Sequence, residues 1–140
     1  MIGSLIDGIA GALRAEFGDG YEIYEEQIRQ GLQPPCFYIS CVDSQQNRFV
    51  GNVFRAEHRF LVLFFPQGEN TNRECMETID RLWQALEVID CKYGKIRGTG
   101  MQAEVRDGLL NFSLTYKMDL RQEAAEIEKM EHLEGRYKGV

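Results

Sequence analysis

The longest regular pattern along the chain is an alternation of apolar and polar residues over residues 109–120. Its apolar positions share one face of an extended strand: Leu110, Phe112, Leu114, Tyr116, Met118 and Leu120. Asp107-Gly108, a preferred pair for a two-residue hairpin turn, comes directly before this run. With the turn there, apolar residues of the two arms lie opposite one another: Val105 and Leu110, Ala103 and Phe112, Met101 and Leu114. Turn chemistry and hydrophobic pattern therefore predict the same register for a hairpin over residues 99–120.

The downstream arm of this hairpin is long for a small domain. Its residues at about 3.3 Å each would span roughly 40 Å, whereas a usual strand spans about 17–20 Å. The part that the domain does not cover must fray, bend or lie against another chain, because exposed strand invites pairing. The strand length is therefore a first indication of an assembly protein.

Two other stretches have the spacing of amphipathic helices. Residues 2–17 carry apolar residues at steps of three and four and end before Gly18 and Gly20. Thr71-Asn72-Arg73-Glu74 has the form of a capping box, which predicts Thr71 as the N-cap of a second helix of about 18 residues. The apolar residues assigned to this second helix are Met76, Ile79, Leu82, Trp83, Leu86 and Ile89.

Extended segments account for most of the remaining chain. The pattern predicts a short edge strand over residues 21–27, a strand over residues 36–44 and a short strand over residues 91–96. Residues 53–65 predict a longer strand whose second half is apolar on both faces. Such a strand is expected to run from an exposed rim into the domain centre, with a helix on one side.

Polar, glycine and proline residues separate these segments. Residues 43–51 are polar and predict a turn or excursion, and Gly98-Thr99-Gly100 predicts a turn into the hairpin. Pro34-Pro35 predicts a stiff loop, because each proline forces the residue before it to be extended. The predicted order is α-β-β-β-α-β-β-β, an α+β fold with a mainly antiparallel sheet, two helices packed on one face and a long protruding β-hairpin.

The end of the chain differs in character from the rest. We expect residues 1–120 to form a single α+β domain and residues 121–140 to form a charged C-terminal extension. A thin apolar stripe at steps of three runs through this extension: Ala124, Ile127, Met130 and Leu133. The stripe predicts a marginal helix or arm that becomes ordered only against a partner.

Composition narrows the classes of function. The 16 basic and 22 acidic residues give a formal net charge of −6, which argues against gripping a nucleic-acid backbone, because that needs a basic face. No secretory leader and no apolar run long enough to span a membrane are recognisable, so we expect neither export nor membrane insertion. The four cysteines lack CxxC spacing and are expected to be reduced, mostly buried thiols.

No catalytic, cofactor-binding or metal-binding residue is predicted. The chain lacks the common serine-hydrolase, zinc-protease, dinucleotide and phosphate-loop motifs. Residues 94–100 come nearest to a phosphate loop, but their spacing is wrong and no helix follows them. His58 lies in a predicted strand with no Cys or His at ligand spacing, so a structural or surface role is favoured.

Three groups of residues carry a resemblance to a known family. The first is Gln30-Gly31-Leu32 followed by Pro35-Cys36-Phe37-x-Ile39. The second is Phe60-x-Val62-x-Phe64-Phe65-Pro66, and the third is Met101 followed by Asp107-Gly108-Leu109-Leu110-x-Phe112-x-Leu114-x-Tyr116. In this order and spacing, over residues 2–120, the chain resembles the small tail terminator proteins of tailed phages and Gram-positive prophages.

The resemblance implies an α/β domain that forms a hexameric ring on the end of the tail tube. Such a ring stops tube polymerisation and offers a docking surface to the head–tail connector. In contractile systems, including headless tailocin particles, it implies a collar that also meets the last sheath ring. The expected partners are copies of the same chain, the tail tube protein, and the sheath protein or connector, with DNA passing through the lumen without specific binding. The expected location is the virion, at the tail end next to the head, after assembly in the host bacterial cytoplasm.

The resemblance implies no catalytic residues, so function is expected to be spread over surfaces between subunits. We hypothesise that the ring interface uses the hairpin tip, which comprises Arg106, Asp107, Gly108 and Leu109, and the polar rim of the long strand, which comprises Arg55, Glu57 and Arg59. Arg suits carboxylates at interfaces. For Arg55 and Arg59 alone, however, ordinary surface ion pairs within the chain are the favoured interpretation.

Two alternative functions stay open at this point. One is another ring or connector component, such as a head-completion or tube protein. The other is a small enzyme or ligand-binding α+β domain that happens to be acidic. The second alternative predicts a discrete monomer or dimer with a concave polar pocket.

Overall fold

A computed structural model describes residues 1–25, 31–122 and 137–139 of the chain. The apolar stripe near the amino terminus forms helix α1 (Ile2–Phe17), which has the predicted bounds and buries Leu5, Ile9 and Leu13. Helix α2 (Thr71–Leu86) follows the second apolar stripe and buries Leu82 and Leu86. Both helices therefore present an apolar face to the rest of the domain.

The described strands form one sheet in the order β1-β2-β3-β6-β5-β4, with β7 against β6. Their bounds are β1 (Glu22–Tyr24), β2 (Cys36–Val50), β3 (Val53–Phe65), β4 (Val88–Cys91), β5 (Gly94–Arg106), β6 (Leu109–Gln122) and β7 (Tyr137–Gly139). β1 runs parallel to β2, and every other pair is antiparallel. The α+β class and the order of elements up to β6 confirm the prediction.

The core lies between the two helices and one face of the sheet. Large side chains that the sheet contributes to it, each fully buried, include Phe37, Ile39, Phe60, Phe64, Phe112 and Tyr116. Phe37 packs against Phe17 of α1 and Phe64 of β3, with ring centroids 4.8 Å and 5.1 Å apart. Burying such a side chain contributes about 1.5–3 kcal/mol. This one apolar layer is therefore the main source of stability.

The β5–β6 hairpin has the predicted turn and most of the predicted register. Val105 lies opposite Leu110 and Ala103 opposite Phe112, and the register continues to Gln102. Between Thr99 and Gln102 the register shifts by one residue, and Gly100 there has a φ of 60°. A glycine in this conformation is typical of a β-bulge, so the predicted pairing of Met101 with Leu114 is lost there.

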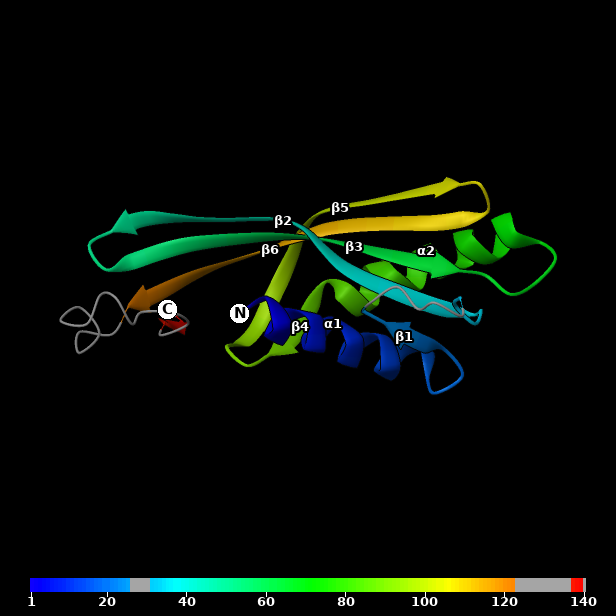
Figure 1. Ribbon diagram of the computed structural model, residues 1–140, viewed down its shortest axis with the longest axis horizontal. Helices are drawn as coiled ribbons and strands as arrows, with labels where there is room; N and C mark the ends of the chain where they lie inside the picture. Colours follow the sequence, from blue (N-terminus) through cyan, green and yellow to red (C-terminus); the bar gives the residue numbers. More distant parts are fainter. Residues whose placement is uncertain (26–30, 123–136, 140) are drawn as a thin grey trace.

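The sheet extends well beyond the helices. In Figure 1, β2, β3 and the end of β6 project to the left past α1 and α2, whereas the right-hand half of the sheet lies against them. Among the described residues, the β2–β3 hairpin, which turns at Gly51, projects farthest. In the β2 arm of this hairpin, residues 43–48 are polar and exposed, so this arm can project into water, whereas Ala56 and His58 of the β3 arm are buried.

The prediction of a turn or excursion over residues 43–51 is wrong. These residues continue β2 as far as Val50, and they pair with β3 from Asp43 opposite Arg59 to Val50 opposite Val53. Residues 43–48 are exposed whichever face of β2 they lie on, so polar side chains suit them, and pairing with β3 supplies the backbone hydrogen bonds that hold the segment extended.

The prediction for residues 91–96 is also wrong. β4 ends at Cys91, and the chain turns there and enters β5 at Gly94. Ile89, which was assigned to the second helix, is a buried residue of β4. The N-cap of α2 is Asn70, whose side chain accepts a hydrogen bond from the Arg73 N–H at 3.4 Å, and Thr71 is the first helical residue.

The carboxyl-terminal part of the chain is described only in part. β6 continues to Gln122, two residues past the predicted boundary between domain and extension. The predicted marginal helix lies almost wholly outside the described residues. Residues 137–139, however, return to the sheet as β7 and pair with the end of β6. The sequence did not predict this strand.

Candidate functional site

The tip of the β5–β6 hairpin lies against helix α2. Asp107 and Gly108 have φ values of 53° and 77°, as a type I′ turn requires. The carbonyl oxygen of Gly108 accepts a hydrogen bond from the Cys75 thiol at 3.8 Å. A Cβ atom added to Gly108 would lie 3.5 Å from Oγ1 of Thr71. The tip is thus supported by α2, and its exposed side chains are held at a fixed place.

Arg106 is the basic residue at this tip. Its guanidinium donates a 2.7 Å hydrogen bond to Glu104 on the same strand face. This contact and the charge of Glu104 raise the pKa of Arg106. Both side chains are exposed, so the pair contributes little to folding and its donors stay accessible to a partner.

The polar rim of β3 lies on the face of the sheet away from α1 and α2, which we call the outer face. Arg55 forms an ion pair with Asp119 of β6 at 2.9 Å, and this contact lowers the pKa of Asp119. Glu57 lies 3.9 Å from the ammonium of Lys117. Arg55 therefore has an ion pair within its own chain, as the favoured interpretation expects, and its role at an interface stays a prediction.

Arg59 differs from its neighbours on the rim. It is exposed, and it has no ion pair among the described residues. Asp43 of β2 and Thr115 of β6 lie directly across from it. A guanidinium that the fold itself does not engage is available to a carboxylate of another chain.

The structure does not bring the tip and the rim together. Leu109 begins β6 next to the tip, whereas Arg55 pairs with Asp119, ten residues farther along the same strand. At about 3.3 Å per residue, Arg55 lies roughly 33 Å from the tip along β6, and Arg59, which pairs with Thr115, lies roughly 20 Å from it. The tip and the rim are therefore separate areas of the sheet.

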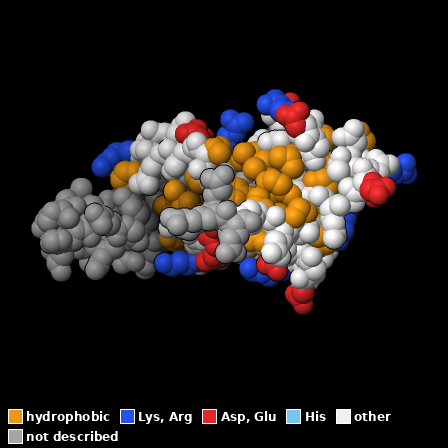
Figure 2. All heavy atoms as spheres, turned by 45° about the vertical axis from the view of Figure 1, so that its right-hand side comes forward, with side chains coloured by type: hydrophobic (Ala, Val, Ile, Leu, Met, Phe, Trp, Pro, Cys, Tyr) orange, Lys and Arg blue, Asp and Glu red, His pale blue; other side chains and the backbone are white. Residues whose placement is uncertain are grey.

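The outer face also carries an apolar area. Leu61, Leu63 and Phe65 of β3 point to this face and are half-buried, as is Tyr38, which lies opposite Leu63. None of them packs in the core cluster. Figure 2 shows hydrophobic side chains gathered at the surface near the middle of the molecule, with charged side chains around them. The two-sided apolar run over residues 60–65 was the sequence signal for this area.

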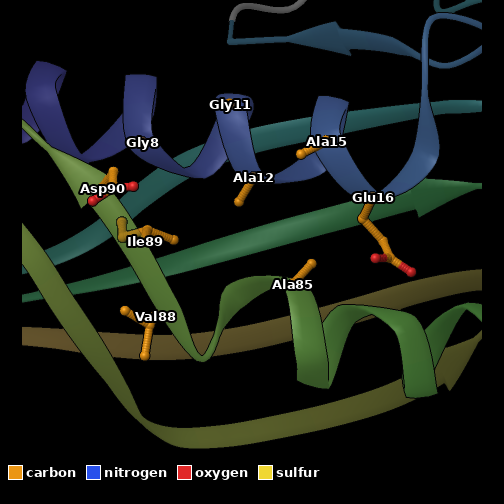
Figure 3. Close-up of a pocket in the computed structure, with 9 residues that line it drawn as sticks. All are labelled: Gly8, Gly11, Ala12, Ala15, Glu16, Ala85, Val88, Ile89 and Asp90. Atoms are coloured by element: carbon orange, nitrogen blue, oxygen red, sulfur yellow. The ribbon is translucent and has the colours of Figure 1, made fainter.

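A shallow groove of about 360 Å³ runs between α1 and the segment that joins α2 to β4. Figure 3 shows its lining, with Gly8, Gly11, Ala12 and Ala15 on α1 facing residues 85–90. A Cβ atom on Gly8 would lie only 2.8 Å from the carbonyl oxygen of Asp90. The groove is therefore a packing seam in which small residues allow helix and strand to approach closely.

His58 has a structural environment, in agreement with the sequence prediction. Its side chain is buried between Ser44 and Met1: Nδ1 lies 2.9 Å from the Ser44 hydroxyl, and Nε2 lies 2.8 Å from the Met1 sulfur. Burial and the nearby terminal ammonium lower the pKa of His58. A neutral histidine in this position joins β2 and β3 to the start of α1.

The cysteines are free thiols, as predicted. Burial, with a smaller contribution from the charge of Glu22, raises the pKa of the Cys36 thiol to about 11, so its thiolate form is disfavoured at neutral pH. Within residues 1–25, 31–122 and 137–139, no three His, Cys, Asp or Glu side chains are placed to hold a metal ion. No helix in this part of the chain is long and apolar enough to cross a membrane.

Comparison with known proteins agrees with the resemblance seen in the sequence. No curated protein matches the chain significantly. A sequence model of the family described as phage tail terminator protein matches residues 4–128, which covers all but the first two residues of α1, all of α2 and β1 to β6. This family is a structural component of the phage tail, whose members interact with other tail components. The chain therefore belongs to the phage tail terminator protein family.

Proposed function

We propose that this chain is the terminator that closes the tail tube. In this proposal, copies of the chain form a hexameric ring on the last ring of tube protein, stop further polymerisation and present a docking surface to the head–tail connector. In a headless contractile particle, the same ring would be the collar that meets the sheath. The match to the tail terminator family is the observation that carries the proposal.

The dimensions of the sheet support an assembly of several copies. β2, β3 and β6 extend past both helices (Figure 1), and strands of 13 to 15 residues exceed the usual length. Copies placed side by side would cover the exposed strands. A ring built in this way uses two different surfaces on each copy, in agreement with the separation of tip and rim.

The surface chemistry supports a role without catalysis. The formal net charge of −6 suits a channel through which DNA slides without sticking. The candidate surfaces consist of exposed ion pairs, polar side chains and half-buried apolar residues. Such a surface is suited to contacts between proteins, whose specificity comes from many modest interactions.

Deletion of the gene from the particle that encodes this chain tests the proposal. We expect tails of uncontrolled length, or tails that never join heads, when the particles are imaged by electron microscopy. Supplying the intact chain from a plasmid should restore the normal tail length and show that the defect belongs to this chain. Complete particles with tails of normal length after the deletion would contradict the proposal.

A further inference from the structure

Two edges of the sheet lack a strand partner among the described residues. β1 pairs with β2 only at residues 36–38, so the same edge of β2 is open from residue 39 to residue 50. On the other side of the sheet, β4 pairs with β5 only up to Arg97. The edge of β5 is therefore open over residues 99–106, where Figure 1 shows this strand at the upper border of the sheet.

Bulges divide each open edge, and we consider the longest regular segment on it. In β2 the register shifts between Cys41 and Asp43 and again between Arg48 and Val50, so residues 43–48 pair regularly with β3. In β5 the shift lies between Thr99 and Gln102, so residues 102–106 pair regularly with β6. Each segment has about the usual length of a strand. Neither contains Lys or Pro, and each carries one acidic and one basic residue, so the two edges can complement each other in charge.

The directions of the two strands are compatible with pairing between copies. β2 and β6 run the same way, because each is antiparallel to β3, and β5 is antiparallel to β6. β5 of one copy would therefore meet β2 of the next in antiparallel orientation, which is the prevailing arrangement in this sheet. The two edges lie on opposite sides of the strand order, so the contact is heterologous and can close into a ring.

We propose that residues 102–106 of one copy pair with residues 43–48 of the next, so that the sheet continues from subunit to subunit. This inference rests on the proposed ring. We choose the register in which Asp43 lies opposite Arg106, because it places a carboxylate across from a guanidinium. The other outer-face positions then bring Gln45 opposite Glu104 and Asn47 opposite Gln102, and each of these pairs can hydrogen-bond. Asp43 is exposed and has no ion pair among the described residues, so its carboxylate is available to the neighbouring Arg106.

A charge exchange between Asp43 and Arg106 tests this pairing. We expect Asp43→Arg and Arg106→Asp each to reduce retention of the chain on isolated tail tubes by about tenfold or more, because each places like charges together. The double variant should restore retention. Within one chain the two residues lie roughly 20 Å apart along the sheet, since Asp43 is level with Thr115 and Arg106 with Leu109. Rescue therefore requires contact between copies.

A matched double variant controls for total charge. Asp43→Arg with Arg97→Asp has the same net charge as the exchange and alters an exposed arginine of the same strand. It should remain as defective as Asp43→Arg alone. Circular dichroism should show native folding of every variant, because all three side chains are exposed.

The possible failures are distinguishable. If the unaltered chain does not bind tube ends, the proposed function fails, and this inference fails with it. If the unaltered chain binds but the single variants bind equally well, or the exchange rescues no better than its control, the β2–β5 pairing is wrong while the terminator function stands. Hydrogen exchange provides a second readout: residues 43–48 and 102–106 should gain amide protection on tubes, and unchanged exchange there would overturn the pairing.

Discussion

At the scale of single residues, Gly8 determines how closely α1 approaches β4. An added Cβ would lie 2.8 Å from the Asp90 carbonyl oxygen. We predict that Gly8→Ala lowers the free energy of unfolding by about 1–3 kcal/mol, because helix and strand must separate. Gly11→Ala is the matched control: nothing lies within 4 Å of its added Cβ, so removing a helical glycine should raise stability by about 0.5–1 kcal/mol. Urea unfolding of both variants measures the difference, and equal effects would contradict the close approach.

His58 makes stability depend on pH. Burial, with a smaller effect of the terminal ammonium, lowers its pKa in the folded chain below the ordinary value of about 6.5. The unfolded chain therefore binds the proton more readily, so stability is fully present above about pH 6.5 and falls as the pH drops toward the folded pKa. We predict a loss of stability as the pH falls below about 6.5 that is weaker in His58→Gln. Urea unfolding across this range tests it, and parallel pH profiles would contradict it.

At the scale of secondary-structure elements, Tyr116 joins β6 to the end of α2. Its buried hydroxyl donates a 2.7 Å hydrogen bond to the carbonyl oxygen of Leu86, and burial raises its pKa. Tyr116→Phe should lower the free energy of unfolding by about 1–3 kcal/mol, because the buried carbonyl loses its partner. Tyr38→Phe should have little effect, since the Tyr38 hydroxyl has no hydrogen bond within the described part of the chain. Thermal unfolding compares the two, and a neutral Tyr116→Phe would show the bond to be dispensable.

The sequence predicted the elements whose apolar residues face the core. The stripe of α1 and the hairpin at Asp107-Gly108 were recognisable because the apolar side chains of each element lie on one face, which is buried. Ile89 was misassigned because it continues the helical spacing from Leu86, although the chain has already entered β4. For the N-cap, Asn70 and Thr71 are adjacent residues that both favour this position, so the sequence could not separate them.

The projecting half of the sheet was harder to predict. Residues 43–48 show no alternation of apolar and polar side chains, because all of them are exposed, and only their pairing with β3 shows that they form a strand. For the candidate site, the sequence named the rim and tip residues as interface candidates but could not show how far apart they lie along β6. The open edges of β2 and β5 depend on strand order, which composition and periodicity do not contain.

At the scale of the whole molecule, the rim of β3 should matter for assembly and little for folding. We predict that Arg55→Glu with Arg59→Glu leaves the fold intact but reduces retention on tail tubes by about tenfold or more, because both side chains are exposed and would face a neighbouring copy. Sedimentation of the variant with tubes measures this effect. Arg14→Glu with Arg73→Glu, two exposed arginines on the helices, changes the charge equally and should bind normally. Equal retention of both double variants would contradict a role for the rim.

The most direct test of the central claim is electron microscopy of isolated tail tubes mixed with the purified chain. The claim is that the strands of this protein extend past its helices and that identical neighbouring copies cover the exposed part. We predict one closed ring of six copies at a single end of each tube, and no further growth from that end when tube protein is added. Separate copies scattered along the tube wall, or capped ends that continue to grow, would contradict it.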